Sequence, residues 1–348
     1  MTHFEVAVVG AGMAGLTCAQ QLYQAGYRVV VVEKSRGLGG RLATRRLEGT
    51  HADHGVCYLK PKDDRFQSLV KTLIDCSILQ IWTDTIHELD ANGQVQEPSE
   101  RSTRYASPLG FSAIGKFLST GLPLIQNQRV AKIELIAQKW HLQFENDSAI
   151  TADSVIVAIP APQAVTILES IPDLDFLQTL KSVQYSACIT AIALYPVQPH
   201  SLGWKAIVCP HDSDLGWIAL DSSKQNSASQ PVFIVQSNAA FADRHLDTTD
   251  LQPVGQHLLN KAAQVLPWLS APQVLQVHRW RYAFPTQPLI EKYLTANTEL
   301  PLICAGDWCG GNRVESAFLS GLATAEQLNS QLQQRPLNRE FWRAIPYE

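Results

Sequence analysis

The sequence has little of what marks several large classes of protein. Its 348 residues contain no run of eighteen or more uncharged apolar residues, so no membrane-spanning helix is expected. Lys and Arg number 28 and Asp and Glu number 32, so the net charge of −4 favours neither a nucleic-acid nor a membrane-surface partner. Internal repeats and low-complexity tracts are also missing. These absences favour a globular chain of two domains that acts on a small molecule.

Signals for secretion, disulfides or metals are missing as well. The seven cysteines are scattered, odd in number and without Cys-x-x-Cys or zinc-ligand spacing, which favours reduced thiols in the cytoplasm. The apolar opening, residues 4–16, lacks a basic leading segment and contains three glycines, so it indicates a strand and turn and not a signal peptide. His51, Asp53 and His54 are too close together in an irregular segment to point at one ion, so we expect no metal.

The chain nevertheless shows clear alternation of strands and helices. Residues 5–9 and 28–32 are short apolar runs that predict strands, and residues 13–25 between them predict a helix that ends at Gly26. Residues 301–305 predict a buried strand, followed by a helix over 315–333. The order strand, helix, strand at the start is typical of a dinucleotide-binding fold.

The central part of the chain has a different pattern. The segments Ile189–Leu194, Gly216–Leu220 and Val232–Val235 are short apolar or alternating runs separated by polar turns, which predicts an antiparallel sheet. Residues 225–230 are rich in Ser and Asn and indicate an exposed hairpin loop, although a flexible loop over a pocket has the same composition. Residues 251–266 predict an amphipathic helix.

A glycine-rich turn joins the first strand to the first helix. It reads Gly10-Ala11-Gly12-Met13-Ala14-Gly15. Gly10 permits a tight turn, Gly12 lets the backbone approach a pyrophosphate, and Gly15 allows close packing of helix on strand. Glu33 ends the second strand, where a carboxylate accepts hydrogen bonds from ribose hydroxyls. This context predicts a dinucleotide site but does not distinguish FAD from NAD.

Two further segments favour FAD. The run from Lys34 to Arg41 ends in Gly39-Gly40-Arg41, a second turn whose arginine offers a fork to phosphates. Far along the chain, Asp307 follows a strand, where it can accept from ribityl hydroxyls. The helix after it begins with Val314-Glu315-Ser316-Ala317, whose amides can face the flavin carbonyls. Taken singly, Asp307 could be a turn residue and Glu315 a partner of the helix dipole.

With these motifs the chain resembles the flavin amine-oxidase superfamily and, within it, the renalase-like branch of small FAD-dependent oxidoreductases. The segments that carry the resemblance are residues 8–15, 39–44, 53–58, 107–114, 152–160, 278–282 and 303–321. The resemblance implies an α/β chain (α+β overall) in which a Rossmann-type FAD-binding domain is interleaved with a mixed-sheet substrate domain. It also implies that the FAD is held non-covalently.

The resemblance also divides the chain. The FAD-binding domain is expected to be discontinuous, formed by residues 1–60, 101–160 and 285–334. The substrate domain would comprise residues 61–100 and 161–284, and residues 335–348 would form a C-terminal tail without an assigned role.

Several site residues follow from the resemblance alone. Val130 would lie against the adenine through its backbone, and the turn Gly55-Val56-Cys57-Tyr58 would lie near the flavin. In that turn Cys57 stands where the family has glutamine. The substrate-facing Arg-Asn pair of the branch falls at Gln225-Asn226 and its histidine at Gln236, so both basic groups are missing here.

The branch oxidises mis-reduced dihydronicotinamide isomers to NAD(P)+, passing a hydride to FAD and then electrons to oxygen. By resemblance, an NAD(P)H-type molecule is therefore the first candidate for the substrate, and a dihydronicotinamide needs no general base. The residues expected in the substrate pocket are Tyr58, Asn226, Gln236, Trp280, Tyr282 and Trp308. An amine oxidase and a flavin-binding protein without turnover remain alternatives, and the electron acceptor and oligomeric state stay open.

Overall fold

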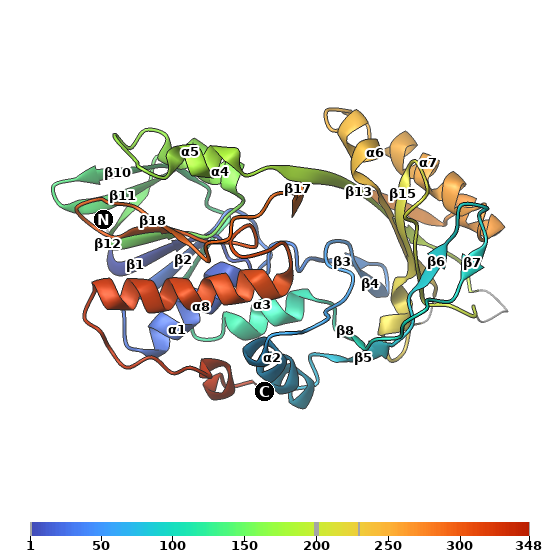
Figure 1. The fold of residues 1–348 in the computed structure, drawn as a ribbon, viewed down its shortest axis with the longest axis horizontal. Helices are drawn as coiled ribbons and strands as arrows, with labels where there is room; N and C mark the ends of the chain where they lie inside the picture. Colours follow the sequence, from blue (N-terminus) through green and yellow to red (C-terminus); the bar gives the residue numbers. More distant parts are fainter. Residues whose placement is uncertain (1, 198–201, 229, 348) are drawn as a thin grey trace.

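The computed structural model describes residues 2–197, 202–228 and 230–347. Within these residues the chain builds two large sheets that lie side by side, each with its own helices (Figure 1). Two small two-stranded ribbons, β3–β4 and β5–β8, lie between them in the picture. The strands of these ribbons are β3 (Thr44–Leu47), β4 (Thr50–Asp53), β5 (Gln80–Thr83) and β8 (Arg104–Ala106).

The first sheet has eight strands and a parallel centre. Its order is β10-β11-β12-β1-β2-β9, with β19 paired to β12 and β18 paired to β19. The strands are β1 (His3–Val9), β2 (Val29–Glu33), β9 (Leu124–Gln126), β10 (Val130–Ile136), β11 (Lys139–Phe144), β12 (Ala149–Val157), β18 (Leu294–Thr295) and β19 (Leu302–Cys304). All five residues of β2 are buried, as expected for a parallel strand that is covered on both faces.

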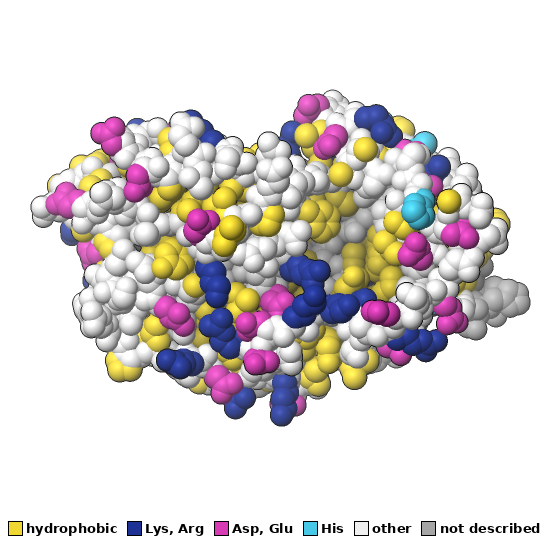
Figure 2. All heavy atoms as spheres, in the orientation of Figure 1, with side chains coloured by type: hydrophobic (Ala, Val, Ile, Leu, Met, Phe, Trp, Pro, Cys, Tyr) yellow, Lys and Arg dark blue, Asp and Glu magenta, His cyan; other side chains and the backbone are white. Residues whose placement is uncertain are grey.

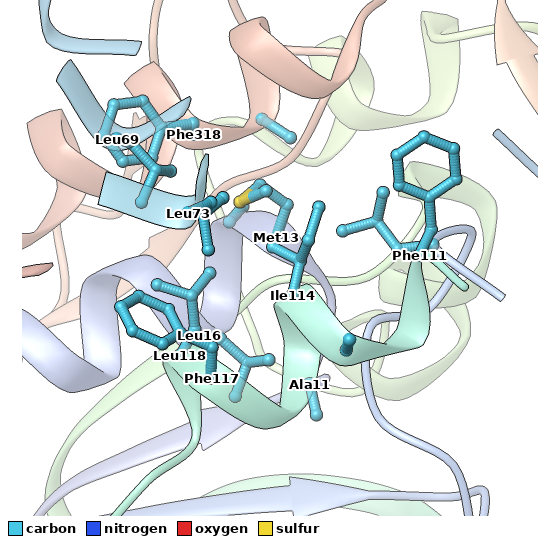
Figure 3. Close-up of a cluster of buried hydrophobic side chains, with 14 of the residues drawn as sticks. Ala11, Met13, Leu16, Leu69, Leu73, Phe111, Ile114, Phe117, Leu118 and Phe318 are labelled. Carbon is cyan, nitrogen blue, oxygen red and sulfur yellow. The ribbon is translucent and has the colours of Figure 1, made fainter. Parts of the chain in front are cut away.

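Helices cover both faces of this sheet, so it has a separate hydrophobic core on each side. One face carries α1 (Met13–Gln24), α3 (Ser112–Leu118) and α8 (Val314–Gln331). Figure 3 shows side chains of this core, among them Leu16, Ile114 and Phe318, pointing toward one another. The opposite core contains residues of α4 (Ala161–Leu168) and α5 (Leu177–Ser182).

The second sheet has seven strands in the order β17-β13-β16-β15-β14-β6-β7. These are β6 (His87–Leu89), β7 (Val95–Gln96), β13 (Tyr185–Leu194), β14 (Ala206–Val208), β15 (Leu215–Leu220), β16 (Val232–Ser237) and β17 (Val274–Pro285). Among the described strand pairs of this second sheet, β14–β6 alone is parallel, so the sheet is mixed. Helices α6 (Ala239–Arg244) and α7 (Gln252–Ala262) share a core with one face of it.

The expected fold class is confirmed, and most expected elements lie within one or two residues of their predicted bounds. The antiparallel pairing of β13, β16 and β15 was also expected correctly. Helix α7 is shorter than predicted, because residues 263–266 form turns that lead into the 3₁₀ turn η2 (Pro267–Ser270), which begins at a proline. The expected loop at 225–230 is exposed at residues 226–228, and Ser229 lies outside the described residues.

Two segments pack differently from the predicted division of the chain, whose boundaries remain a prediction. Helix α2 (Asp64–Asp75), expected with the substrate domain, packs Leu69 and Leu73 into the core of α1 and α8 (Figure 3). The tail was given no role, yet the 3₁₀ turn η3 (Phe341–Ala344) buries Trp342 against Phe318. Apolar side chains on both segments therefore complete the first core.

Candidate active site

A large cavity of about 1940 Å³ lies between the two sheets. It is bounded by both glycine-rich turns, the β3–β4 ribbon, one face of the seven-stranded sheet and the start of α8. Figure 2 shows a hollow between the two halves, with hydrophobic side chains inside and Lys and Arg side chains near its edge. Pockets for drug-sized ligands measure about 300–1,000 Å³, so this cavity has room for a dinucleotide and a second small molecule.

The first glycine turn has the geometry that a pyrophosphate site needs. Gly10 has a φ of +104°, which favours glycine. A Cβ on Gly15 would lie 2.0 Å from the backbone oxygen of Gly10, so this position must stay bare for α1 to pack on the turn. A Cβ on Gly12 would meet nothing within 4 Å, and Gly12 lines the cavity. The space beside Gly12 is therefore open to a ligand.

The second glycine turn is fastened to the first. The Gly39 N–H donates to the Ala11 carbonyl at 2.8 Å. On the other side lies Gly115 of α3, where a Cβ would be 2.8 Å from Gly39. This close packing brings Gly40 and Arg41 to the cavity wall. The sequence signal for it, a glycine within the helix over 112–118, was not used in the prediction.

Acidic and basic groups at this end of the cavity already have partners. The Glu33 carboxylate accepts from the backbone N–H groups of Ala11 and Ser35, both at 2.9 Å. Arg41 makes a two-pronged pair with Asp307, with both N–O distances 2.7 Å, and donates to the carbonyl of Ala283 at 3.0 Å. Burial opposes the charge on Arg41, but Asp307 more than offsets it and raises the pKa of the guanidinium. The predicted contact of Arg41 with phosphates would use its remaining N–H groups.

The start of α8 closes the inner end of the cavity. Val314, Glu315 and Ala317 line it, as the sequence predicted for a cofactor contact. The Glu315 carboxylate is also engaged, since it accepts from the backbone N–H groups of Lys62, at 2.8 Å, and Asp63. Glu315 thus connects the loop before α2 to the N-terminal end of α8.

The floor of the cavity on the donor side is one face of the seven-stranded sheet. Along β17, alternate residues His278, Trp280 and Tyr282 line the cavity, and on neighbouring strands Gln236 and Trp217 do so. The other face of β17 packs on α7, where a Cβ on Gly255 would lie 2.3 Å from Val277. Arg279 and Arg281 of β17 also line the cavity, so both sides of this edge strand reach it, and the predicted residues Trp280 and Tyr282 lie together because they share the strand.

The turn at residues 55–58, called here the flavin-side turn, contacts this face of the sheet through Cys57. Its thiol donates to Oε1 of Gln236 at 3.3 Å, and Nε2 of Gln236 donates to the Gly55 carbonyl at 3.1 Å. Burial raises the pKa of the Cys57 thiol to about 12, with Lys224 acting in the opposite direction. Cys57 therefore remains a neutral hydrogen-bond donor at neutral pH.

Comparisons with known proteins agree with this geometry. Residues 8–73 match the NAD(P)-binding Rossmann-like domain, and residues 100–329 match the family of flavin containing amine oxidoreductases. The chain belongs to that family. It is 25% identical to renalase of Mus musculus over 343 residues, which cover 93% of this chain and 98% of the relative.

Solved structures show the same fold at low sequence identity. A putative protoporphyrinogen oxidase from Exiguobacterium sp. 255-15 has a TM-score of 0.74 at 13% identity, with 95% of this chain and 99% of that chain covered. Cyclohexylamine oxidase from Brevibacterium oxydans IH-35A has a TM-score of 0.72 at 13% identity, with 94% and 99% covered. The protein is accordingly an FAD-dependent oxidoreductase with renalase homology.

The residues present fit FAD, as the open space beside Gly12 and the size of the cavity require. Those that line the cavity and would hold it are Gly10, Gly12, Met13, Glu33, Lys34, Gly40, Arg41, Gly55, Val56, Cys57, Tyr58, Asp307, Val314, Glu315 and Ala317. Ala14, Gly15 and Val130 are not in the lining. Gly15 serves packing, while Val130 is buried at the start of β10.

Two residues predicted for the substrate pocket of this flavoenzyme lie elsewhere. Asn226 is exposed and outside the lining, because the turn η1 (Asp221–Lys224) directs Lys224 inward and the following residues outward. Gln225 beside it is held by the His51 carbonyl at 2.8 Å. Trp308 is completely buried and donates to the Ile159 carbonyl at 3.2 Å, so it is a core residue.

Sequence reasoning missed a buried ionic cluster behind the flavin-side turn. Lys224 lies 2.5 Å from Asp221 and 3.4 Å from Asp53, and none of the three side chains is more than 3% exposed. The Asp53 N–H donates to Asp221 at 2.9 Å, and Asp53 accepts from the Phe111 N–H at 2.8 Å. The cluster thus joins the β3–β4 ribbon, α3 and η1 two residues before Gly55. No local sequence motif indicates this cluster, because Asp53 is far in sequence from Asp221 and Lys224.

Gln225 and Gln236 stand where the family resemblance predicts basic groups, yet the cavity contains other cations. Eleven Lys and Arg residues line the cavity, against four Asp and Glu. One of these cations is Arg104, whose guanidinium lies 5.0 Å from the Tyr58 ring centroid. Arg104, burial and then the nearby Lys62 and Arg313 lower the pKa of Lys60, so these like charges are close together. Four of these cations, Arg41, Arg279, Arg281 and Arg313, belong to segments that carry the family resemblance, and the other seven do not.

No helix among the described residues is both long and apolar enough to cross a membrane.

Proposed function

We propose that this flavoenzyme oxidises a small reduced donor of the dihydronicotinamide type, with oxygen or another molecule as the final electron acceptor. FAD, when bound, supplies the acceptor for the donor's hydride. The chain's own residues bind and orient the donor and keep water away from it.

The observation that carries this proposal is the state of the acidic groups in the cavity. An amine substrate enters as an ammonium ion and needs a free carboxylate or a base. Of the four carboxylates in the lining, Asp307 is paired with Arg41, while Glu33 and Glu315 accept from backbone N–H groups. The fourth, Glu88, is about half exposed and lies 3.9 Å from Nε2 of His211. Eleven basic residues surround them, so a neutral or anionic donor is favoured over a cationic one.

Aromatic side chains are placed to hold a flat ring. Tyr58 and Trp217 approach with their ring centroids 5.8 Å apart, and Trp280 is fixed by an indole N–H bond of 2.8 Å to the His54 carbonyl. Tyr282 packs edge-on to Tyr185 at 5.6 Å. Such a set can stack against a nicotinamide ring and requires no general base, because loss of hydride from a dihydronicotinamide creates an aromatic ring.

The test is an anaerobic titration of the purified holoprotein. Oxidised flavin absorbs near ~450 nm, and α-NADH, β-NADH and a panel of primary amines are added separately while that band is followed. We expect rapid bleaching by a dihydronicotinamide, with NAD+ as the matched non-reducing control that leaves the band unchanged. Bleaching by amines alone would make the protein an amine oxidase, and no bleaching by any donor would contradict the proposal.

A further inference from the structure

A histidine in the cavity wall lacks a hydrogen-bond partner. His54 is 6% exposed, lines the cavity, and its Nδ1 is buried with no partner among the described residues. A buried polar atom without a partner is unfavourable, so a ligand group that hydrogen-bonds to this ring would stabilise the site.

A second histidine and a tryptophan hold His54 in place. The His278 ring is edge-on to His54 with centroids 4.8 Å apart, and Trp280 stacks on His54 at 5.4 Å. The His54 carbonyl accepts from Trp280 at 2.8 Å and from the Thr190 hydroxyl at 3.2 Å. The two imidazoles therefore occupy fixed positions on the wall.

A cation without a counterion stands beside this pair. Arg45 on β3 is exposed, lines the cavity and forms no ion pair among the described residues. Burial, then His278 and Arg45, lower the pKa of His54 to about 3. Burial and Arg45 lower the pKa of His278 to about 4. The β13 and β16 residues beside His278 are the uncharged Thr190 and Gln236, so no acid balances the positive charge.

We propose that Arg45, His54 and His278 form a subsite for an anionic oxygen group of the donor, a phosphate or a carboxylate, beside Trp280. The proposal rests on the function proposed above and names the group that the donor carries. An anion here accepts from the Arg45 guanidinium and from imidazole N–H groups, which satisfies His54 and balances the charge. The subsite supplies cations in a cavity that lacks the family's arginine and histidine.

Calorimetric titration of the holoprotein with non-reducing probes tests the subsite without turnover. Nicotinamide mononucleotide and nicotinamide riboside differ by one phosphate, and nicotinic acid and nicotinamide differ by one carboxylate. We expect at least one anionic probe to bind ten times more tightly than its partner. Arg45→Gln and His278→Gln should each reduce that ratio to below threefold.

Arg46→Gln is the matched control. Arg46 follows Arg45 on β3, lies opposite His51 in the ribbon and also lines the cavity. Because neighbouring strand residues point to opposite sides, Arg46→Gln removes the same charge as Arg45→Gln from the other side of β3. Its ratio should stay within twofold of the wild type. An equal loss in Arg46→Gln would show general attraction and overturn the subsite, as would an unchanged ratio in both Arg45→Gln and His278→Gln.

The pH dependence gives a readout that a structural role would not move. A bound anion raises the pKa of the two imidazoles, so binding takes up protons and tightens as the pH falls from 8 toward 5. NAD+ is the probe, because its pyrophosphate does not titrate in this range. His278→Gln should flatten the dependence, and a wild-type affinity independent of pH would contradict the subsite. Amine oxidation with intact anion discrimination would refute the donor class while leaving the subsite standing.

Discussion

The two ends of the cavity differ in how far their polar groups are satisfied. At the cofactor end, Glu33 accepts two backbone N–H groups and Arg41 is matched by Asp307. At the donor end, Arg45 has no acidic partner among the described residues and His54 has an unpartnered nitrogen. The cofactor end is therefore preorganised, whereas the donor end depends on its ligand for part of its hydrogen bonding.

The two ends also differ in how the chain builds them. The cofactor end comes from contiguous turns, residues 10–15 and 37–41, with one distant contribution from the start of α8. The donor end is assembled from the β3–β4 ribbon and six strands of the other sheet. A cofactor that all family members bind can be held by local sequence motifs. A donor that differs between members requires a site whose side chains can change independently on separate strands.

The largest expected effect breaks the link between the two ends. Lys224→Met leaves Asp53 and Asp221 buried without their cation, and breaking a buried pair in this way costs about 3–5 kcal/mol of unfolding free energy. Burial raises the pKa of Asp221, and Lys224 opposes that rise. An acid whose folded pKa lies above its unfolded value destabilises the fold at neutral pH, so the deficit should shrink as the pH falls from 8 to 5.

Urea unfolding at several pH values measures the Lys224 effect, and Lys205→Met is the matched control. Lys205 is an exposed lysine whose Nζ donates to the Trp82 carbonyl at 2.6 Å without a carboxylate. Its loss should cost about 1 kcal/mol and show no comparable pH dependence. Equal effects of the two variants would mean that the ionic cluster does not hold the ends together.

A smaller effect separates packing from cofactor contact within the cofactor end. Gly15→Ala forces a Cβ toward the Gly10 oxygen, so we expect about 1–3 kcal/mol of lost stability as well as lost flavin. Gly12→Ala fills only open space, so the apoprotein should unfold at the wild-type urea concentration while the purified protein retains less flavin. Normal flavin content in Gly12→Ala would remove Gly12 from the cofactor site.

The cofactor end was predictable because its signals are local. Positive φ at Gly10 and the bare position at Gly15 are requirements of the backbone itself, and they leave a fixed glycine spacing in the sequence. Trp280 and Tyr282 both line the cavity because they share one strand, and their role toward the donor stays a prediction. The fold class followed from the same periodicities.

The donor end was predicted poorly because its contacts are tertiary. Lys224, Asp53 and His278 come from distant segments, and nothing adjacent to them in sequence indicates that they meet. Family positions also misled where the local backbone changed, as at Asn226, which the turn before it sends to the surface. Charge balance within a cavity is likewise a property of the folded chain, so no local motif indicates that eleven Lys and Arg residues meet around this cavity.

The smallest of the three effects concerns the place where the two ends meet. Arg41 bonds Asp307 at the cofactor end and the carbonyls of Tyr282 and Ala283 on the donor floor. Arg41→Ala should weaken flavin retention about tenfold, roughly 1.4 kcal/mol, through lost hydrogen bonds and an unpaired Asp307. Arg41→Lys keeps the charge but not the two-pronged geometry, so it should recover only part of the loss. The measurement is the ratio of flavin to protein absorbance after gel filtration at decreasing concentration. Full flavin content in Arg41→Ala would show that the pair with Asp307 serves the fold alone, and the predicted phosphate contact would then be wrong.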